Sequence, residues 1–384
     1  MQGKTLSERV RSIADSPTLA LNARVKELIR KGEKVINLSV GEPDSPTPER
    51  IKKTGISAIQ ENFTRYTPSR GIPDLISAIQ EKFSRENGIE YSPEEIMVTP
   101  GAKFALYLIF QALLDPGDEV IIPVPYWVSY PEQVKLAGGI PVFVESGDDH
   151  LPDLEKIREK ISSRTKILLI NSPNNPSGRV FPLSLIESLA ELCRERGLWL
   201  VSDEIYEKLI FKGEHLSPAS LSPEIKEITL TVNGFSKTFA MTGWRLGYVA
   251  GKAEVIKAMA KIQSQSVSCP DSIAQRAGVT ALKEAMEDVE RMIRDLRERK
   301  EFLEREIPSL GLKLTPLEGT FYAFLGLPPG WEDSKEFARR LLEEFRVAVV
   351  PGVAFGKEGY IRMSYAVSLP QLQEGVEKLR RFLS

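Results

Sequence analysis

The residues of this sequence that are best suited to chemistry follow short apolar segments, and the clearest such segment precedes Lys237. Residues Ile228 to Val232 carry no charge and are all β-branched except Leu230, which is typical of a strand inside a sheet. Asn233 and Gly234 then turn the chain, and Lys237 follows just past the strand end. A lysine in this place is more often a solvated surface residue, so its meaning depends on its neighbours.

A second segment ends in Gly101-Ala102-Lys103, directly before the helix expected at Phe104 to Leu114. A phosphate needs unpaired backbone N–H groups at a helix start, and these residues supply them. Ser236 and Arg245 would add a hydroxyl and a fixed positive charge to the same anion. Since most helix starts bind nothing, plain helix initiation is the alternative.

Asp203 ends a third segment, where a carboxylate could hold the proton of a protonated ring nitrogen. A charge pair about 4 Å apart, at an effective dielectric near 20, is worth about 4 kcal/mol, or roughly three pKa units. Asp203 could therefore keep such a ring positively charged at neutral pH. The alternative role is a helix N-cap before Glu204 to Ile210.

Further polar and aromatic residues could complete a site for the same ring. Tyr206 and Asn175 could hydrogen-bond a phenolic oxygen, and Trp127 could stack on the ring face. Arg362 could clamp a carboxylate with two parallel hydrogen bonds, and Gly41 permits close approach of the backbone to a ligand. Taken singly, each has a plainer interpretation as a core aromatic, turn asparagine, interface tryptophan, surface arginine or turn glycine.

These residues must be positioned by strands, and five apolar segments with the length of strands precede them. The expected strands are Glu95 to Thr99, Glu119 to Val124, Lys166 to Ile170, Leu198 to Ser202, and Ile228 to Val232. They alternate with helices such as Leu183 to Arg196, which indicates a mostly parallel sheet with helices on both faces. Ligands on such sheets bind outside the carboxyl ends of the strands, so we expect the clusters to converge on one crevice.

The two ends of the chain have a different character. The last third begins with a long charged helix at Ala285 to Glu306 and continues with mixed strands and helices, which predicts a smaller α+β domain. One of its strands is expected at Val347 to Val350. Near the amino terminus, Ser16-Pro17-Thr18 is expected to interrupt the helical pattern, and a helix is expected at Asn22 to Lys31.

Composition excludes several classes of function. The 384 residues are 42% apolar and 27% charged, with a net charge of −2, so neither nucleic acid nor an anionic membrane is an expected partner. Met1 to Val10 lacks the apolar core of a secretory signal, and no apolar segment has the length of a membrane span, so we expect a cytoplasmic protein. Two cysteines and two histidines disfavour a disulfide framework and a multi-histidine metal site, and no metal is expected.

Three motifs together resemble class I aminotransferases of the aspartate aminotransferase family, which use pyridoxal 5′-phosphate (PLP). They are Asn-Asn-Pro-Ser-Gly at 174–178, Ser-Asp-Glu-Ile-Tyr at 202–206, and Ser-Lys at 236–237 with Arg245. The similarity covers nearly the whole chain and implies the fold-type I architecture of α/β class. It implies an amino-terminal arm at 1–45 that joins the small domain, a large PLP-binding domain at 46–284, and a small domain at 285–384.

The resemblance also implies a role for each residue. Lys237 would be the covalent anchor of PLP and the base that transfers protons, with Asp203 on the pyridine nitrogen. The other cofactor-binding residues would be Gly101, Ala102, Lys103, Trp127, Asn175, Tyr206, Ser236, Arg245 and Tyr66. Tyr66 would reach the phosphate in the neighbouring subunit of a homodimer. One departure is visible, because Gly234 stands where some members have a phosphate-binding serine.

Substrate choice follows from the same resemblance. Gly41 and Arg362, beside Trp127 and Asn175, would hold the α-carboxylate of the amino acid or 2-oxo acid. Lys103, with Ser16 and Thr18, resembles the bacterial subgroup that binds a distal carboxylate, which favours transfer of the amino group from L-aspartate to 2-oxoglutarate, giving oxaloacetate and L-glutamate.

Several alternatives stay open. They are an aromatic, alanine or prephenate aminotransferase, and a PLP-dependent carbon–sulfur lyase. A ligand sensor for transcription would need an added DNA-binding domain, for which the residues before Gly41 leave no room.

Overall fold

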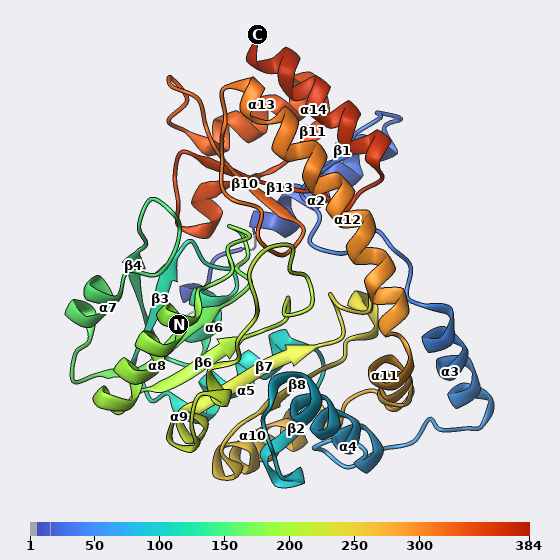
Figure 1. Ribbon diagram of the computed structural model, residues 1–384, viewed down its shortest axis with the longest axis vertical. Helices are drawn as coiled ribbons and strands as arrows, with labels where there is room; N and C mark the ends of the chain where they lie inside the picture. Colours follow the sequence, from blue (N-terminus) through green and yellow to red (C-terminus); the bar gives the residue numbers. More distant parts are fainter. Residues whose placement is uncertain (1–5, 16) are drawn as a thin grey trace, which may run out of the picture.

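A seven-stranded sheet forms the centre of the larger part of the computed structural model, which describes residues 6–15 and 17–384 (Figure 1). Its strands, in spatial order, are β2 (Ile96–Thr99), β8 (Gly247–Ala250), β7 (Thr229–Gly234), β6 (Trp199–Asp203), β5 (Thr165–Asn171), β3 (Glu119–Val124) and β4 (Ile140–Glu145). Only β8 runs antiparallel to its neighbours β2 and β7, while the other pairs are parallel. The mostly parallel sheet predicted from the sequence is confirmed.

Helices cover both faces of this sheet. One face packs against α5 (Ala102–Leu113), α6 (Tyr130–Leu136) and α10 (Ala253–Ser266). The other packs against α7 (Leu154–Lys160), α8 (Leu183–Arg196) and α9 (Pro223–Ile228), and, beside β2 and β8, against α3 (Glu49–Gln60), α4 (Pro73–Lys82) and α11 (Ser272–Glu284). In β5, Leu168 and Leu169 therefore enter different cores, which explains why Ile167 to Ile170 form an unbroken apolar segment rather than an alternating one.

A second, antiparallel sheet lies in the carboxyl-terminal part, in the order β12 (Val350–Pro351), β13 (Tyr360–Ser364), β10 (Tyr322–Gly326) and β9 (Lys313–Leu314). Helices α13 (Ser334–Phe345) and α14 (Leu369–Leu383) accompany it, and α12 (Met286–Glu306) runs from the large sheet's helices toward them (Figure 1). The amino-terminal strand β1 (Ile36–Asn37) pairs in parallel with β11 (Val347–Ala348). This pairing supports an arm that joins the small domain, although the boundaries at 45 and 285 stay predictions.

Four local expectations were wrong. Asn233 and Gly234 do not turn the chain but continue β7, where they pair with Tyr248 and Gly247 of β8. Helix α2 (Pro17–Arg30) begins at Pro17 instead of Asn22, because proline is well tolerated in the first turn of a helix. The strand expected at Val347–Val350 is divided between β11 and β12, which pair in different sheets. No helix follows Asp203, which excludes the N-cap alternative; its Oδ1 instead accepts the Ile205 N–H at 3.2 Å within a turn.

Strands β4 and β8 and helices α10 and α11 were not predicted from the sequence. The described residues also include the short helix α1 (Glu8–Ser12), and none of the described helices has the length and apolar character needed to cross a membrane.

Candidate active site

A cleft of about 620 Å³ opens at the carboxyl ends of the large sheet and is closed on its other side by residues of the small sheet. It brings together most of the residues singled out in the sequence: Thr18, Gly41, Ala102, Lys103, Trp127, Asn175, Asp203, Tyr206, Ser236, Lys237, Arg245 and Arg362. Gly101 adjoins the cleft beside Ala102. The turns after β2, β3, β5, β6 and β7 therefore do meet at one crevice, as parallel strand ends allow.

The structure does not place every predicted residue at the cleft. Tyr66 has a relative exposure of 89% and lies away from it. Ser16 lies outside the described residues.

Lys237 follows β7 and reaches into the cleft, where its amine donates a hydrogen bond to the Gly41 carbonyl. Burial, helped by the positive charge of Arg362, lowers the pKa of Lys237 to about 8. A lowered pKa leaves a larger fraction of the amine unprotonated at neutral pH, which a nucleophilic lysine requires.

Asp203 is buried at the end of β6. Its Oδ2 accepts a hydrogen bond from the Tyr130 hydroxyl at 2.7 Å, and its backbone carbonyl accepts one from Asn171 Nδ2 at 2.8 Å. Burial raises the pKa of Asp203 to about 6, against the lowering effect of the Tyr130 hydrogen bond. A cation beside this carboxylate would offset its burial cost, so the position suits a positively charged ligand atom.

Asn175, Tyr206 and Arg362 contact one another across the cleft. Arg362 Nη1 donates to Asn175 Oδ1 at 2.8 Å, and Asn175 Nδ2 lies 3.5 Å from the Tyr206 hydroxyl. Arg362 is 3% exposed, and no carboxylate of the described residues pairs with it. A buried guanidinium without an anionic partner is suited to binding a ligand carboxylate.

Three glycines shape the helix start at the other end of the cleft. Gly101 has φ +84°, and a Cβ there would lie 2.4 Å from Arg245 Nη2. A Cβ on Gly247 would lie 2.4 Å from the Ala102 backbone nitrogen, so glycine lets β8 and α5 approach. At Gly234 a Cβ would lie 3.0 Å from Gly247 Cα on the neighbouring strand β8, so a side chain there would require the backbone to shift by a few tenths of an ångström.

Lys103 lies at the first turn of α5, with its Nζ 4.8 Å from the centre of the Trp127 ring. Burial, and then the charge of Arg245, lower the pKa of Lys103. With Thr18 also lining the cleft, the position of Lys103 suits an anionic group of a ligand.

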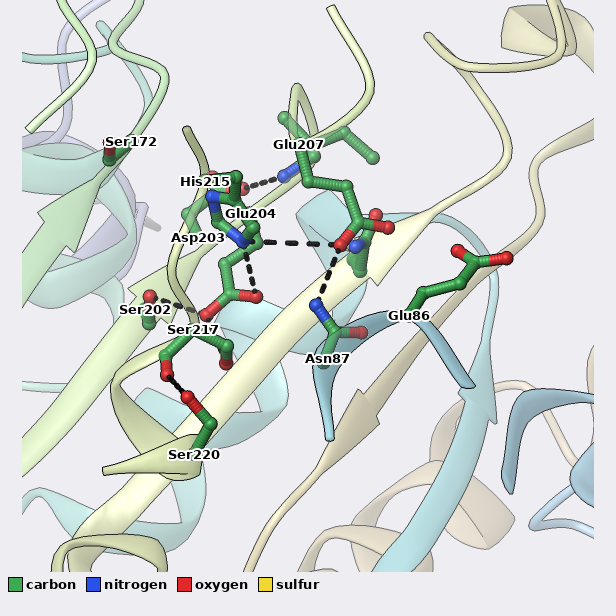
Figure 2. A network of polar contacts seen from close by, with 12 residues as sticks. Glu86, Asn87, Ser172, Ser202, Asp203, Glu204, Glu207, His215, Ser217 and Ser220 are labelled. Atoms are coloured by element: carbon green, nitrogen blue, oxygen red, sulfur yellow. Dashed lines mark hydrogen bonds and ion pairs between the residues drawn. The ribbon is translucent and has the colours of Figure 1, made fainter. Parts of the chain in front are cut away.

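A buried charged network lies next to the cleft, in the turn after β6 (Figure 2). It joins Glu204, Glu207, His215 and Lys82. His215 Nε2 lies 3.1 Å from Glu204 Oε2 and 3.9 Å from Glu207 Oε2, and Lys82 is paired with Glu207. The two glutamates and the histidine could in principle hold a metal ion, but Lys82 already supplies a cation. We therefore interpret the network as structural.

Several lining residues were missed in the sequence, including Tyr130, Asn171, Ser39 and Tyr322. Tyr130 and Asn171 stand within the clusters that follow β3 and β5, so a more careful look at those clusters could have found them. Ser39, whose carbonyl accepts Arg362 Nη2 at 3.1 Å, stands just before the Gly41 turn. Tyr322 on β10 has no local signal, because a tyrosine in an apolar strand resembles any core residue.

Comparison with known proteins identifies the family. The profile of the family described as "Aminotransferase class I and II" matches residues 33–379. The chain is 48% identical to the aspartate/prephenate aminotransferase of Thermus thermophilus, over 98% of each chain. It is 46% identical to the aspartate aminotransferase of Geobacillus stearothermophilus, again over 98% of each chain.

The structure gives the same result. A solved structure described as the aspartate aminotransferase from Thermus thermophilus with maleate superimposes with a TM-score of 0.96, at 47% identity, covering 98% of this chain and 99% of that one. The chain belongs to the class I and II aminotransferase family and is an aminotransferase, with the α/β fold predicted for it.

Proposed function

We propose that this enzyme uses PLP to transfer the amino group of L-aspartate to 2-oxoglutarate, giving oxaloacetate and L-glutamate. The observation that carries the proposal is the charge of the cleft. Among the described residues, its lining includes four cations, Lys103, Lys237, Arg245 and Arg362, but only two carboxylates, Glu42 and Asp203. A phosphate beside Arg245 and a dicarboxylate substrate between Arg362 and Lys103 would supply anionic partners for these cations.

The residues fit PLP in kind and position. Arg245 beside the start of α5, with Ser236, would hold the phosphate, and Asp203 would hold the pyridine nitrogen. Tyr206 and Asn175 would hydrogen-bond the phenolic oxygen, and Trp127 would stack on the ring. PLP supplies an electron sink for the bond that breaks at the substrate's α-carbon.

The protein's own groups would then position the substrate and move the proton. Lys237, with its pKa lowered to about 8, is suited to carry the cofactor and to shuttle a proton to and from the α-carbon. Arg362 and Gly41 would fix the α-carboxylate, while Lys103 and Thr18 would bind the distal carboxylate. Ser16, which the sequence also predicts for this subsite, lies outside the described residues.

The range of substrates is a separate part of the proposal, and it rests on the names of the relatives. The names of the relatives support aspartate, and those from Thermus thermophilus and Aquifex aeolicus also include prephenate, so prephenate as a second amino acceptor is our alternative proposal. An aromatic or alanine aminotransferase and a carbon–sulfur lyase have no specific observation in their favour.

Assembly is a further proposal. The exposed Tyr66 would reach the cofactor phosphate of a second copy, which requires a homodimer. We also propose a cytoplasmic location.

The test is the absorption spectrum of the purified enzyme. Addition of L-aspartate alone should convert the bound cofactor to its aminated form, and 2-oxoglutarate should restore the first spectrum, because each half-reaction is complete by itself. Release of ammonia and a 2-oxo acid from an amino acid, without a change that 2-oxoglutarate reverses, would instead indicate a lyase. Prephenate in place of 2-oxoglutarate tests the second acceptor.

A further inference from the structure

Tyr322 lies where the two parts of the molecule meet at the cleft. It is 1% exposed, stands at the start of β10, and still lines the cleft. Its ring lies under the guanidinium of Arg362, with 4.2 Å between Arg362 Cζ and the ring centre. A second ring, that of Phe355, lies 4.9 Å from the same atom.

The Tyr322 ring restrains the orientation of the Arg362 guanidinium, which its hydrogen bonds alone do not fix. Nη1 and Nη2 donate to Asn175 and to the Ser39 carbonyl, at 2.8 and 3.1 Å, while Nε is buried without a hydrogen-bond partner in the described part of the chain. Two hydrogen bonds to terminal nitrogens locate one end of the guanidinium but leave its tilt free. A ring face 4.2 Å from a planar cation limits that tilt and lowers the energy of a desolvated charge.

The hydroxyl makes a different contact. It lies 3.2 Å from the Tyr206 hydroxyl, which belongs to the turn after β6 in the large sheet. It is also close to Gly41, where an added Cβ would lie 3.3 Å from the Tyr322 oxygen. One side chain of the small sheet thus contacts the residues proposed for the α-carboxylate and for the phenolic oxygen of PLP.

We propose that Tyr322 is a positioning residue with two separable roles, in which its ring sets the plane of the Arg362 guanidinium and its hydroxyl fixes the Tyr206 hydroxyl. The inference rests on the proposed function. When Tyr206 donates to the cofactor's phenolic oxygen, Tyr322 donates to Tyr206 and makes Tyr206 the stronger donor. The charged and titratable groups that face Tyr206 are Tyr322, Arg362, Asp203, Lys237 and Tyr130.

The variants Tyr322→Met and Tyr322→Phe separate the two roles. They are compared by two equilibrium measurements that need no catalysis, the dissociation constant for maleate and the pH midpoint of the cofactor's absorption change. Tyr322→Met removes ring and hydroxyl, and should weaken maleate binding to the PLP-loaded enzyme about fivefold to thirtyfold. Tyr322→Phe keeps the ring, so its dissociation constant for maleate should stay within about twofold of wild type. Because Tyr206 loses its donor, the pH midpoint of the cofactor's absorption change should rise by about 0.5 to 1 unit.

Controls distinguish this inference from packing and from the proposed function. Tyr365→Phe removes another buried hydroxyl of the same core, which donates to the Thr320 carbonyl at 3.0 Å outside the cleft, and should change neither measurement. Arg362→Lys should weaken maleate binding at least as much as Tyr322→Met. If it does not, the proposed carboxylate site is wrong.

The inference itself is overturned if Arg362→Lys weakens maleate binding while Tyr322→Met does not, or if Tyr322→Phe leaves the absorption midpoint unchanged. Tyr322→Leu replaces the methionine variant if the latter does not fold. Tyr322→Phe preserves the packing volume and is decisive for the hydroxyl in either case.

Discussion

Two groups of charged residues lie near Asp203, and their partners differ. In the network of Glu204, Glu207, His215 and Lys82, the charged atoms face one another, and Ser202 and Ser217 donate to Glu204 at 2.9 and 2.8 Å (Figure 2). In the cleft, by contrast, no carboxylate among the described residues pairs with Arg362, Lys103 or Lys237.

The pKa values follow this difference. Burial alone would raise the pKa of Glu207, but Lys82, His215 and Lys208 outweigh it and lower that pKa to about 2. In the cleft, burial prevails, raising the pKa of Asp203 to about 6 and lowering that of Lys237 to about 8. Mutual pairing compensates the cost of burying these charges, whereas the same types of residue left without it are available to a ligand.

The largest effect should come from removing Lys237. Lys237→Ala should lower kcat by at least about 10⁴-fold, because it removes both the proposed covalent anchor and the proton shuttle. The free energy of unfolding of the cofactor-free protein should change by less than about 1 kcal/mol, since no ion pair is lost. Borohydride reduction followed by peptide mapping checks the anchor, and a cofactor still reducible onto another lysine would contradict the assignment.

Asp203→Asn should come next. Replacing the carboxylate with a neutral amide of the same shape removes about three pKa units of support for a protonated ring nitrogen, so kcat should fall about a thousandfold. The cofactor should remain attached to Lys237. Steady-state kinetics measure the loss, and near-normal turnover would remove Asp203 from the mechanism.

Lys82→Met tests the other side of the comparison. It leaves Glu207 buried without its cation and should lower the free energy of unfolding by at least about 3 kcal/mol. Lys52→Met is the matched control, because Lys52 pairs with Glu49 on the surface and should cost no more than about 0.5 kcal/mol. Chemical denaturation of both variants gives the comparison, and equal losses would mean that the network is not structural.

His150 is buried without a hydrogen-bond or ion-pair partner among the described residues, and it predicts how the stability of the protein depends on pH. Its ring nitrogens have no hydrogen-bond partner among the described residues, and the rings of Phe324 and Tyr360 lie 5.4 and 4.9 Å away. Burial, followed by nearby cations of which Lys357 has the largest effect, lowers the pKa of His150 to about 4, from 6.5.

The unfolded chain therefore takes up this proton at a higher pH than the native protein does. Stability should be lost as pH falls from about 6.5 to 4, by up to about 3 kcal/mol. His150→Asn removes the titrating group and tolerates the positive φ of 60° at this position. Its unfolding free energy should fall less than that of wild type over this pH range, and parallel curves would exclude the effect.

Lys103→Ala should have the smallest effect of the five. Loss of one charge-assisted contact should lower kcat/KM for aspartate about tenfold to a hundredfold, with little change for phenylalanine. Arg362→Ala should instead affect both substrates alike, because every amino acid has an α-carboxylate. If Lys103→Ala lowered kcat/KM for aspartate and for phenylalanine by the same factor, another residue would have to bind the distal carboxylate.

The sequence by itself determined five of the seven strands of the large sheet and the residues proposed for the chemistry of the cleft. Apolar segments of strand length ended in turns with distinctive residues, such as Asn175, Asp203 and Lys237, and parallel strands bring those turns to one edge whatever their order in the chain. The local sequence pattern was therefore enough to predict which residues meet in the cleft. It defines where each strand ends, and a parallel sheet brings those ends to one edge.

Only the tertiary structure decided the contacts between parts that are distant in the sequence. Tyr322 contacts Tyr206, which lies 116 positions away in the sequence. Lys82 of helix α4 likewise pairs with Glu207 of the turn after β6. The division of 347–350 between two sheets likewise depends on which strand arrives beside each half. Such pairings arise from tertiary packing. The local sequence around a buried tyrosine or lysine is the same whether the side chain contacts apolar core residues, a counter-ion or a ligand.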